Sequence, residues 1–579
     1  MSLARREEGH PVGTTYLRCR PASIYSRSIA YTPCAIGLKP DFLFATQYRD
    51  QMELVIRRLA RLITRMQKSL QSLACVLVAW IATAAVSAAD QPNIVYILAD
   101  DMGYGDIQAL NPQGKIATPH LDALVAGGMH FTDAHTSSSV CTPTRYGILT
   151  GRYNWRSRLK EFVLLGYSSH LISTDRLTVP KLLKENGYAT HCVGKWHLGM
   201  DWALKNENPK LDSRGNPAED EIDFTKPIAN GPLSVGFDTF FGISASLDMP
   251  PYVYIRDDKT TVVPTVQTKS FGRAGLTAEG LTPEDVLPDL ADEAASVISK
   301  WGKDKPHFLY LPLPAPHTPI APTDEWKGKS GINSYLDFCM QVDSTVGQVT
   351  QAIADAGLTE NTLIIFTADN GCSPRGELPL MAEHGHHTHL DFRGHKADIF
   401  EGGHRVAFIA QWPEKIKADS QSTQLICTTD LLATCADIVG ADYPDNAGED
   451  SVSILPALLG KNKSPLREAV VHHSINGSFA IRKGDWKLSF CPGSGGWSDP
   501  RPGRADMTGL PENQLYNLAK DRSETNNLVS DNPEMVEELT KLMADYVDRG
   551  RSTPGENQTN DGAETTFQYQ APAPKKKGK

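Results

Sequence analysis

The sequence has no excess of positive charge, which limits the partners that the protein can bind. Lys and Arg number 58 against 68 Asp and Glu, which gives a formal net charge of −10 at pH 7. Residues 1–89 carry 12 Lys and Arg against 5 Asp and Glu, a net charge of +7, so residues 90–579 carry −17. Such a negative field repels nucleic acids at long range. We therefore expect no nucleic-acid partner, and an anionic substrate must enter a locally basic pocket.

The sequence also lacks a convincing membrane span. Its apolar run over residues 73–85 is shorter than the roughly 20 residues that cross a bilayer. Basic residues precede the run from Arg57 to Lys68, and Val86-Ser87-Ala88 follows it as a cleavage site. This pattern predicts a signal peptide over residues 52–89, hence export to the periplasm or beyond without stable membrane insertion. An uncleaved anchor is the alternative.

Residues 1–51 do not fit this pattern, because a signal peptide normally begins at the start of the chain. We interpret them as a mis-assigned start or a disordered segment, with translation beginning at Met52 or Met66. No fold is expected of them.

Cysteine is scarce as well, with 10 in 579 residues, and none of the spacings resembles a zinc motif. Three cysteines lie in residues 1–89, which leaves Cys141 and six others that an exported protein could pair in part. No papain-like or caspase-like signature surrounds Cys141. An alternative is that Cys141 acts as an unmodified thiol nucleophile, with its pKa lowered by the helix N-terminus and by Arg145.

The pattern of apolar segments predicts an α/β fold. Runs over residues 93–99, 307–313 and 363–367 are typical of strands buried on both faces, and helices are expected over 118–127, 178–186 and 333–356. We expect a large, mostly parallel central sheet flanked by helices in a domain over residues 90–463. A smaller C-terminal α+β domain over 464–550 and a flexible tail over 551–579 follow.

The most informative stretch is Cys141-Thr142-Pro143-Thr144-Arg145, followed by Leu149-Thr150-Gly151-Arg152. Proline suits the first turn of a helix, so Cys141 is expected at a helix N-terminus. Free N–H groups and the positive end of the helix dipole favour an anion in front of that position. The stretch therefore predicts an anion-binding site around Cys141.

Two acidic pairs follow predicted strands. Asp100-Asp101 ends the first strand, and Asp369-Asn370 comes directly after the run over residues 363–367. Ligands gather at the carboxyl ends of strands in open α/β sheets. Carboxylate and amide oxygens together suit Ca²⁺. Alone, each pair would more often be a turn or a helix cap; together with Cys141 they predict a metal site.

These motifs together resemble the type I, formylglycine-dependent sulfatase family, in its branch of arylsulfatase A and N-acetylgalactosamine sulfatases within the alkaline phosphatase-like superfamily. The resemblance runs from about residue 92 to residue 528 and includes three further elements. They are Gly194-Lys195-Trp196-His197-Leu198-Gly199, Ala315-Pro316-His317-Thr318-Pro319, and Arg393-Gly394-His395-Lys396 followed by Glu401-Gly402-Gly403-His404-Arg405.

The resemblance implies an activity and a set of residue roles. Cys141 would be oxidised to formylglycine by a formylglycine-generating enzyme, and a Ca²⁺ ion would be held at that position. The residues implied as metal ligands are Asp100, Asp101, Cys141, Asp369 and Asn370. The residues implied to be catalytic are Cys141, Arg145, Lys195, His197, His317 and Lys396. Of these, Lys195, His317 and Lys396 would contact the sulfate, while Arg145 and His197 would hold the aldehyde hydrate.

A histidine-rich segment over residues 383–395 has no fixed role in this scheme. We predict that His386, together with His404, contacts the substrate; a polar loop of ordinary histidines and an adventitious metal site are the alternatives. The expected function is sulfate ester hydrolysis, arylsulfatase-like and acting on a sulfated carbohydrate. A phosphonate or phosphate ester hydrolase of the same superfamily and a non-catalytic glycan-binding relative stay open.

Overall fold

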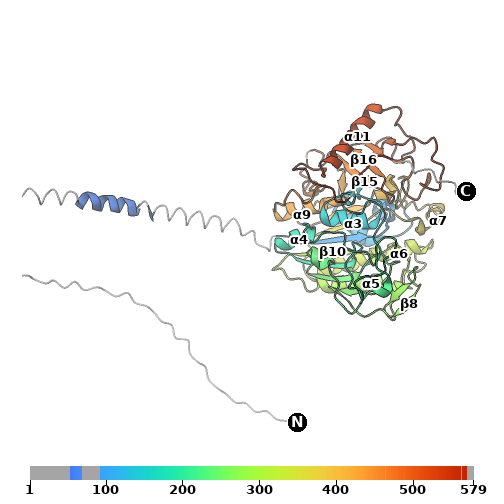
Figure 1. Ribbon diagram of the computed structural model, residues 1–579, viewed down its shortest axis with the longest axis horizontal. Helices are drawn as coiled ribbons and strands as arrows, with labels where there is room; N and C mark the ends of the chain where they lie inside the picture. The colour runs from blue at the N-terminus through green and yellow to red at the C-terminus, as the bar shows by residue number, and fades with distance from the viewer. Residues whose placement is uncertain (1–51, 65, 68–90, 463, 563, 570–579) are drawn as a thin grey trace, which may run out of the picture. The chain divides into compact units, whose positions relative to one another are not determined.

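The computed structural model describes residues 52–64, 66–67, 91–462, 464–562 and 564–569 (Figure 1). The chain divides into two compact units, residues 1–85 and residues 86–579. In the first unit, residues 52–64 form an exposed helix. The expectations for residues 1–51, and for the apolar run and cleavage site of the signal peptide, lie outside the described residues. Of the helices that are described, none is long and apolar enough to cross a bilayer.

The second unit is built on a ten-stranded mixed sheet. Its centre is five parallel strands in the order β11-β1-β10-β4-β5. On one side, β12 (Phe408–Gln411) pairs antiparallel with β11 and with β2 (Met129–Phe131), and β13 (Ser420–Ser422) pairs parallel with β2. On the other side, β6 (Ile255–Arg256) and β7 (Lys259–Thr260) add antiparallel pairings. The bounds of the central strands are Thr362–Ala368 (β11), Asn93–Ala99 (β1), His307–Pro312 (β10), Ala189–Lys195 (β4) and Thr239–Ile243 (β5). The predicted α/β fold with a parallel centre is confirmed, with mixed edges.

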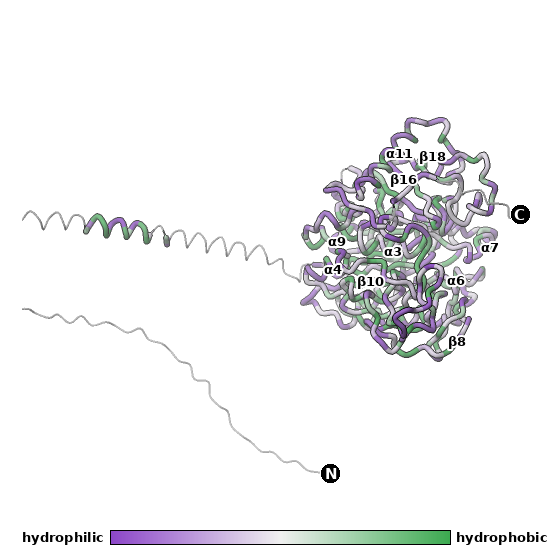
Figure 2. The backbone as a smooth tube through the Cα atoms, in the orientation of Figure 1, coloured by the Kyte–Doolittle hydropathy of each residue, from purple (hydrophilic) through white to green (hydrophobic). Residues whose placement is uncertain are grey.

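The strand β1 shows why this sheet is the core of the unit. All seven of its residues are buried, because the run Asn-Ile-Val-Tyr-Ile-Leu-Ala has apolar side chains at six positions that alternate between two faces. Ile94, Tyr96 and Leu98 pack in one apolar cluster with helices α3, α4 and α9. Val95 and Ile97 pack in a second cluster with α2, α5 and α6. Apolar segments accordingly run through the centre of the unit (Figure 2).

Helices therefore cover both faces of the sheet. Their bounds are Pro119–Gly127 (α2), Cys141–Thr150 (α3), Val179–Glu185 (α4), Pro283–Ile298 (α5), Ser334–Asp355 (α6) and Leu431–Val439 (α9). Three of them were predicted to within two residues at each end. The helix α5 was missed, although Thr282 and Asp285 form a capping box at its start. All seven cysteines among the described residues are buried, and none of them forms a disulfide.

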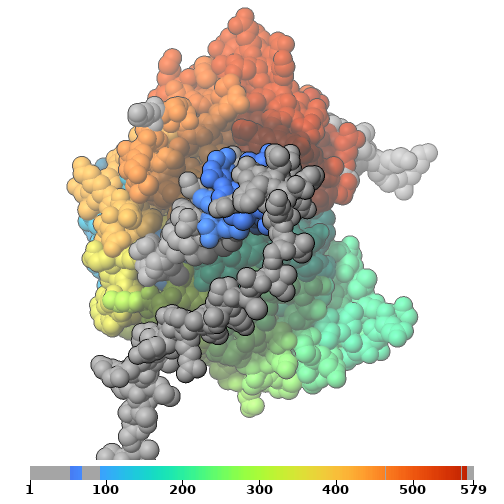
Figure 3. Space-filling view, turned by 90° about the vertical axis from the view of Figure 1, so that its left-hand side faces the viewer, coloured from blue at the N-terminus to red at the C-terminus, as the bar shows by residue number. Residues whose placement is uncertain are grey.

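A smaller antiparallel sheet follows near the C-terminus. Its strands are β15 (Val470–His473), β16 (Phe479–Lys483), β17 (Trp486–Ser489) and β18 (Gln514–Asn517), and α11 (Pro533–Asp548) packs on them. The apolar cluster under α11 also contains Tyr153 and Trp155, which follow α3. This C-terminal part, orange to red in the space-filling view, forms one continuous body within the unit (Figure 3).

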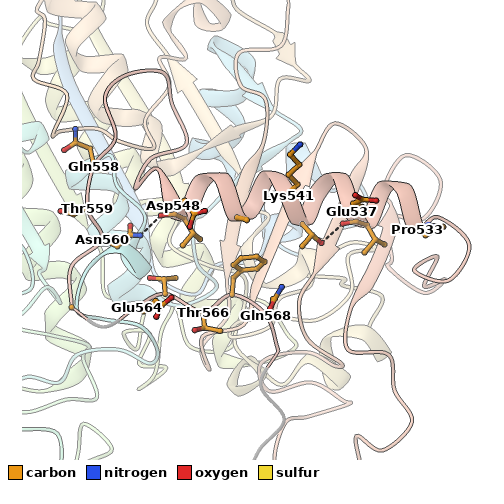
Figure 4. Close-up of a pocket in the computed structure, with 17 residues that line it drawn as sticks. Pro533, Glu537, Lys541, Asp548, Gln558, Thr559, Asn560, Glu564, Thr566 and Gln568 are labelled. Carbon is orange, nitrogen blue, oxygen red and sulfur yellow. Dashed lines mark hydrogen bonds between the residues drawn. The ribbon is translucent and has the colours of Figure 1, made fainter.

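The structure corrects the expected flexible tail for residues 551–562 and 564–569. Asp561 pairs with the buried Arg152 at 2.9 Å, and Asn560 accepts a hydrogen bond from the buried Arg156 at 3.1 Å. The segment lines a groove along α11 (Figure 4). Its polar composition suggested no packing, but buried guanidinium groups need polar acceptors, and this segment supplies them.

Truncation tests the role of this C-terminal segment. A chain ending at residue 550 should lose about 2–4 kcal/mol of unfolding free energy, because Arg152 and Arg156 stay buried while losing acceptors. A chain ending at residue 569 is the control and should keep the full stability. Thermal unfolding followed by circular dichroism measures both, and equal unfolding temperatures would contradict the assigned contacts.

Candidate active site

The carboxyl ends of the parallel strands bring the predicted polar residues together. Asp100 and Asp101 follow β1, Asp369 and Asn370 follow β11, and Lys195 is the last residue of β4. Parallel strands present their carboxyl ends at one edge of the sheet, so residues far apart in the sequence meet there. All five side chains are buried, at 1% exposure or less. His317, five residues beyond β10, joins them at 7% exposure.

The helix α3 places Cys141 at the same edge of the sheet. Cys141 is the first residue of the helix, with Thr142 and Pro143 in the first turn, and all ten helical residues are buried. Potential ligand atoms of Cys141, Asp100 and Asp369 lie within 4.8 Å of one another. The helix N-terminus and the ends of two strands therefore converge on the sulfur atom of Cys141.

Three buried carboxylates are balanced by three buried cations. Lys195 Nζ lies 2.6 Å from Asp100 Oδ2, and Lys396 Nζ lies 2.6 Å from Asp101 Oδ1. Arg145 donates two hydrogen bonds to Asp369 Oδ2, from Nη2 at 2.8 Å and from Nε at 3.1 Å. Buried charges are tolerated only when paired in this way. When all six groups are ionised, their formal charges cancel.

Two oxygen atoms in this cluster have no hydrogen-bond partner among the described residues. They are Asp100 Oδ1 and Asn370 Oδ1, both fully buried. The Nδ2 group of Asn370 donates to Asp101 Oδ1 at 2.7 Å, which fixes the amide and leaves its oxygen free. Unpaired buried oxygens beside carboxylates are the donor set that a hard divalent cation takes. Asp100, Asp101, Asp369 and Asn370 therefore fit a metal ion.

Charge and burial set the protonation of the cluster. Burial alone would raise the pKa of Asp100, but the neighbouring Lys195, His317 and Arg145 hold it well below its usual range. Burial and the adjacent Asp100 raise the pKa of Asp369 to about 7. Burial also raises the pKa of the Cys141 thiol, and Lys195 and Lys396 do not offset this. An unmodified Cys141 is therefore a neutral thiol near pH 7.

The two predicted histidines of the cluster are neutral imidazoles. His197 Nε2 donates to the Leu164 carbonyl at 2.8 Å, and its buried Nδ1 has no hydrogen-bond partner in the described part of the chain. Burial and the nearby Lys195 lower its pKa well below the ordinary value. His317 Nδ1 donates to the Thr318 carbonyl at 2.6 Å, so its Nε2 carries the lone pair. Burial and Lys396 lower the pKa of His317.

The structure does not bring His386 and His404, which we predicted to contact the substrate, to this cluster. His386 is 1% exposed; its Nδ1 accepts from the Lys115 N–H at 3.1 Å and its Nε2 lies 2.9 Å from Asp106 Oδ1. His404 is fully buried, with Nδ1 3.1 Å from His135 Nδ1 and Nε2 3.0 Å from Lys487 Nζ. Both ring nitrogens of each residue are thus occupied by protein groups.

His404 belongs instead to a buried histidine cluster with His135 and His472. The rings of His404 and His472 stack with centroids 3.7 Å apart and an interplanar angle of 11°. The lone pair of an imidazole lies in the plane of its ring, and one ion cannot lie in both of two stacked, nearly parallel planes, so these two rings do not share an ion. The cluster joins β3 (Ala134–His135), a strand outside the ten-stranded sheet, and α8 (Glu401–His404) to β15. We interpret it as a polar link between the C-terminal sheet and these two elements.

Sequence reasoning missed Ser246. Its hydroxyl oxygen lies 3.4 Å from Lys195 Nζ and 3.1 Å from His317 Nδ1, and the residue is 1% exposed. It comes three residues after β5, the fifth parallel strand of the central sheet. Recognising β5 from the run Thr-Phe-Phe-Gly-Ile would have pointed to this position, because residues just past the carboxyl end of a parallel strand lie at the ligand-binding edge of the sheet.

Comparisons with known proteins agree with this geometry. A family model described as Sulfatase matches residues 92–441. The chain is 32% identical over 502 residues to an N-acetylgalactosamine-6-O-sulfatase of Bacteroides thetaiotaomicron, covering 78% of this chain and 92% of that relative. It is 32% identical to arylsulfatase A of Homo sapiens, covering 79% and 88%. A solved structure from work on glycosaminoglycan metabolism by B. thetaiotaomicron matches with TM-score 0.68 and 31% identity, over 79% of this chain and 99% of that chain.

The raised pKa of Asp369 predicts a pH dependence of stability in the metal-free protein. The folded state holds this proton up to about pH 7, whereas an unfolded Asp loses it near pH 4. Stability should therefore fall as pH rises from about 4 to 7, by at most about 1.4 kcal/mol per pH unit from this group.

Chemical denaturation with a chelator present measures the effect. Asp369→Asn should reduce the slope between pH 5 and 7, whereas the exposed-site control Asp324→Asn should leave it unchanged. Identical slopes in the parent protein and Asp369→Asn would refute the assignment.

Proposed function

The chain belongs to the sulfatase family of sulfuric ester hydrolases, and on that premise we propose that it hydrolyses carbohydrate sulfate esters at Cys141. The observation that carries the proposal is the meeting of Cys141, at the N-terminus of α3, with two buried ammonium groups and unpaired carboxylate and amide oxygens. The ammonium groups suit the anionic sulfate ester. The similarity to the N-acetylgalactosamine-6-O-sulfatase of B. thetaiotaomicron supports an amino-sugar sulfate as substrate.

We propose that Cys141 acts as formylglycine. The raised pKa of its thiol makes the unmodified side chain a poor nucleophile near neutrality. Hydrated formylglycine would supply one hydroxyl to attack sulfur and a second to release the sulfate afterwards. Cys141 is 3% exposed, so we infer that a formylglycine-generating enzyme acts on the Cys141-Thr142-Pro143-Thr144-Arg145 motif before the chain folds.

We propose Ca²⁺ as the metal, held by Asp100, Asp101, Asp369 and Asn370 beside residue 141. When bound, it would neutralise the carboxylates and polarise a sulfuryl oxygen. The substrate is extracellular in this proposal, since the predicted signal peptide over residues 52–89 directs the protein to the periplasm or beyond.

The side chains of this chain then have distinct tasks. Lys195 and Lys396 bind the sulfuryl oxygens and stabilise the charge that they carry in the transition state. Arg145, fixed by Asp369, orients the group at residue 141, and the free Nδ1 of His197 accepts a proton from it. His317 donates a proton to the departing sugar oxygen, which requires its imidazolium form.

Substrate assays test the proposal. Enzyme produced with a formylglycine-generating enzyme should cleave 4-nitrophenyl sulfate and a sulfated N-acetylgalactosamine, and should act much more slowly on 4-nitrophenyl phosphate. Cys141→Ala should lower kcat by about a thousandfold or more. Cys192→Ala, a buried cysteine on β4, is the matched control and should stay active.

Three outcomes would point elsewhere. A preference for phosphate or phosphonate esters would favour the rival hydrolase of the same superfamily. Binding of sulfated sugar without any turnover would favour a non-catalytic glycan-binding protein. Full activity of Cys141→Ala would remove residue 141 from the mechanism.

The role of His317 is testable through the leaving group. A sugar alkoxide needs protonation and a nitrophenolate does not, so His317→Gln should lower kcat about 10²- to 10⁴-fold on a sugar sulfate and much less on 4-nitrophenyl sulfate. Because burial and Lys396 lower the pKa of His317 from its ordinary value of 6.5, the imidazolium form is lost below pH 6.5, and kcat on the sugar sulfate should fall as pH rises through that acidic range. His307→Gln, at the far end of β10, is the control. Equal losses on both substrates would contradict the acid role.

A further inference from the structure

Phe162 is an exposed aromatic side chain in a position that packing does not explain. It is 42% exposed, and it is the sole aromatic residue among the large apolar side chains that are exposed in the described part of the chain. Phenylalanine is usually buried, since its ring gains most from leaving water. A single exposed apolar residue is common on protein surfaces, so its backbone and its neighbours decide what it does.

The backbone of Phe162 is held in a strained conformation. Its φ angle is +60°, in the left-handed region that residues with a side chain rarely adopt. Asp101, His197 and Ala397, which lie in or beside the Cys141 cluster, share this feature with φ angles of 66°, 55° and 81°. Strain of this kind gathers at functional sites, where surrounding contacts enforce it.

Hydrogen bonds tie Phe162 to both sides of the cluster. Two residues further on, the Leu164 carbonyl accepts from His197 Nε2 at 2.8 Å, and the Leu164 N–H donates to Thr142 Oγ1 at 3.2 Å. The Phe162 N–H donates to the Ile475 carbonyl at 2.8 Å, and the Ile475 N–H donates to the Ala397 carbonyl at 3.1 Å.

These bonds place the backbone of Phe162 beside the proposed sulfate site. Thr142 follows Cys141, and Ala397 follows Lys396. Two residues of chain span at most about 7 Å, so Phe162 lies close to the Leu164 contacts with His197 and Thr142. The strained backbone of Phe162 thus lies between segments that bond to the nucleophile side and to the Lys396 side of the site, and its ring is exposed.

One face of the ring is already occupied. The guanidinium carbon of Arg214 lies over the ring, 5.5 Å from its centroid. A ring that holds a cation on one face can still stack a ligand on the other. The face of a phenyl ring is flat and apolar and carries no hydrogen-bonding group.

We propose that Phe162 is the platform on which the pyranose ring of the sulfated substrate stacks, an assignment that rests on the proposed sulfatase function. A pyranose has one face of C–H groups that pack on an aromatic ring. Phe162 would bind this face and orient the sugar, while the lysines bind its sulfate. Because the phenyl ring has no polar group, it would recognise the shape of the sugar face and would form no hydrogen bonds with the sugar hydroxyl groups.

Kinetics of three Phe162 variants test the platform. Phe162→Ala should raise KM for a sulfated N-acetylgalactosamine about three- to tenfold with kcat within twofold, as expected for the loss of one stacking contact. Phe162→Tyr, which keeps the ring, should restore KM. Phe162→Gly should raise KM equally while keeping or raising the unfolding temperature, because glycine adopts a φ of +60° without strain. Leu510→Ala, which removes an exposed side chain (37% exposed) outside the site, is the matched control.

Several results would overturn the platform. Unchanged KM in Phe162→Ala and Phe162→Gly would do so, and so would a fall in kcat that Phe162→Tyr does not restore, which indicates a role in positioning Leu164 alone. Failure of the proposed function gives a different result, because parent enzyme carrying formylglycine would then turn over no sulfate ester at all.

Discussion

The site depends on the balance between three buried carboxylates and three buried cations around Cys141. Asp100, Asp101 and Asp369 cannot stay ionised in the interior without Lys195, Lys396 and Arg145, and the cations cannot stay buried without the carboxylates. Among the described residues, two oxygen atoms of this cluster, Asp100 Oδ1 and Asn370 Oδ1, have no hydrogen-bond partner. These atoms are available to bind a metal ion.

The sheet topology makes this balance possible. Five parallel strands end at one edge, so a few residues past each strand suffice to assemble the cluster from segments up to 296 positions apart, from Asp100 to Lys396. The C-terminal sheet contributes contacts around the site from outside the ten-stranded sheet. Ile475 bonds to both Phe162 and Ala397, and the histidine cluster joins α8 to β15. The smaller sheet therefore supports the rim of the site.

The sequence allowed much of this to be predicted, and the failures have physical reasons. The strand β1 and the polar site residues that follow the strands could be predicted from short stretches of sequence. A buried strand is a short apolar run, and ligand-binding residues follow the carboxyl ends of such strands. His386 and His404 were predicted from residue type alone, and type does not reveal that both ring nitrogens are already bonded. Ser246 was missed because the strand β5, which precedes it, was not predicted. The packed C-terminal segment was missed because its contacts with Arg152 and Arg156 span about 400 residues.

The mass of the peptide that contains residue 141, measured on enzyme purified in its active form, tests the central claim most directly. The account predicts that the active fraction carries formylglycine at this position, and that activity across preparations scales with the converted fraction. An intact cysteine thiol at residue 141 in enzyme of full turnover would contradict it.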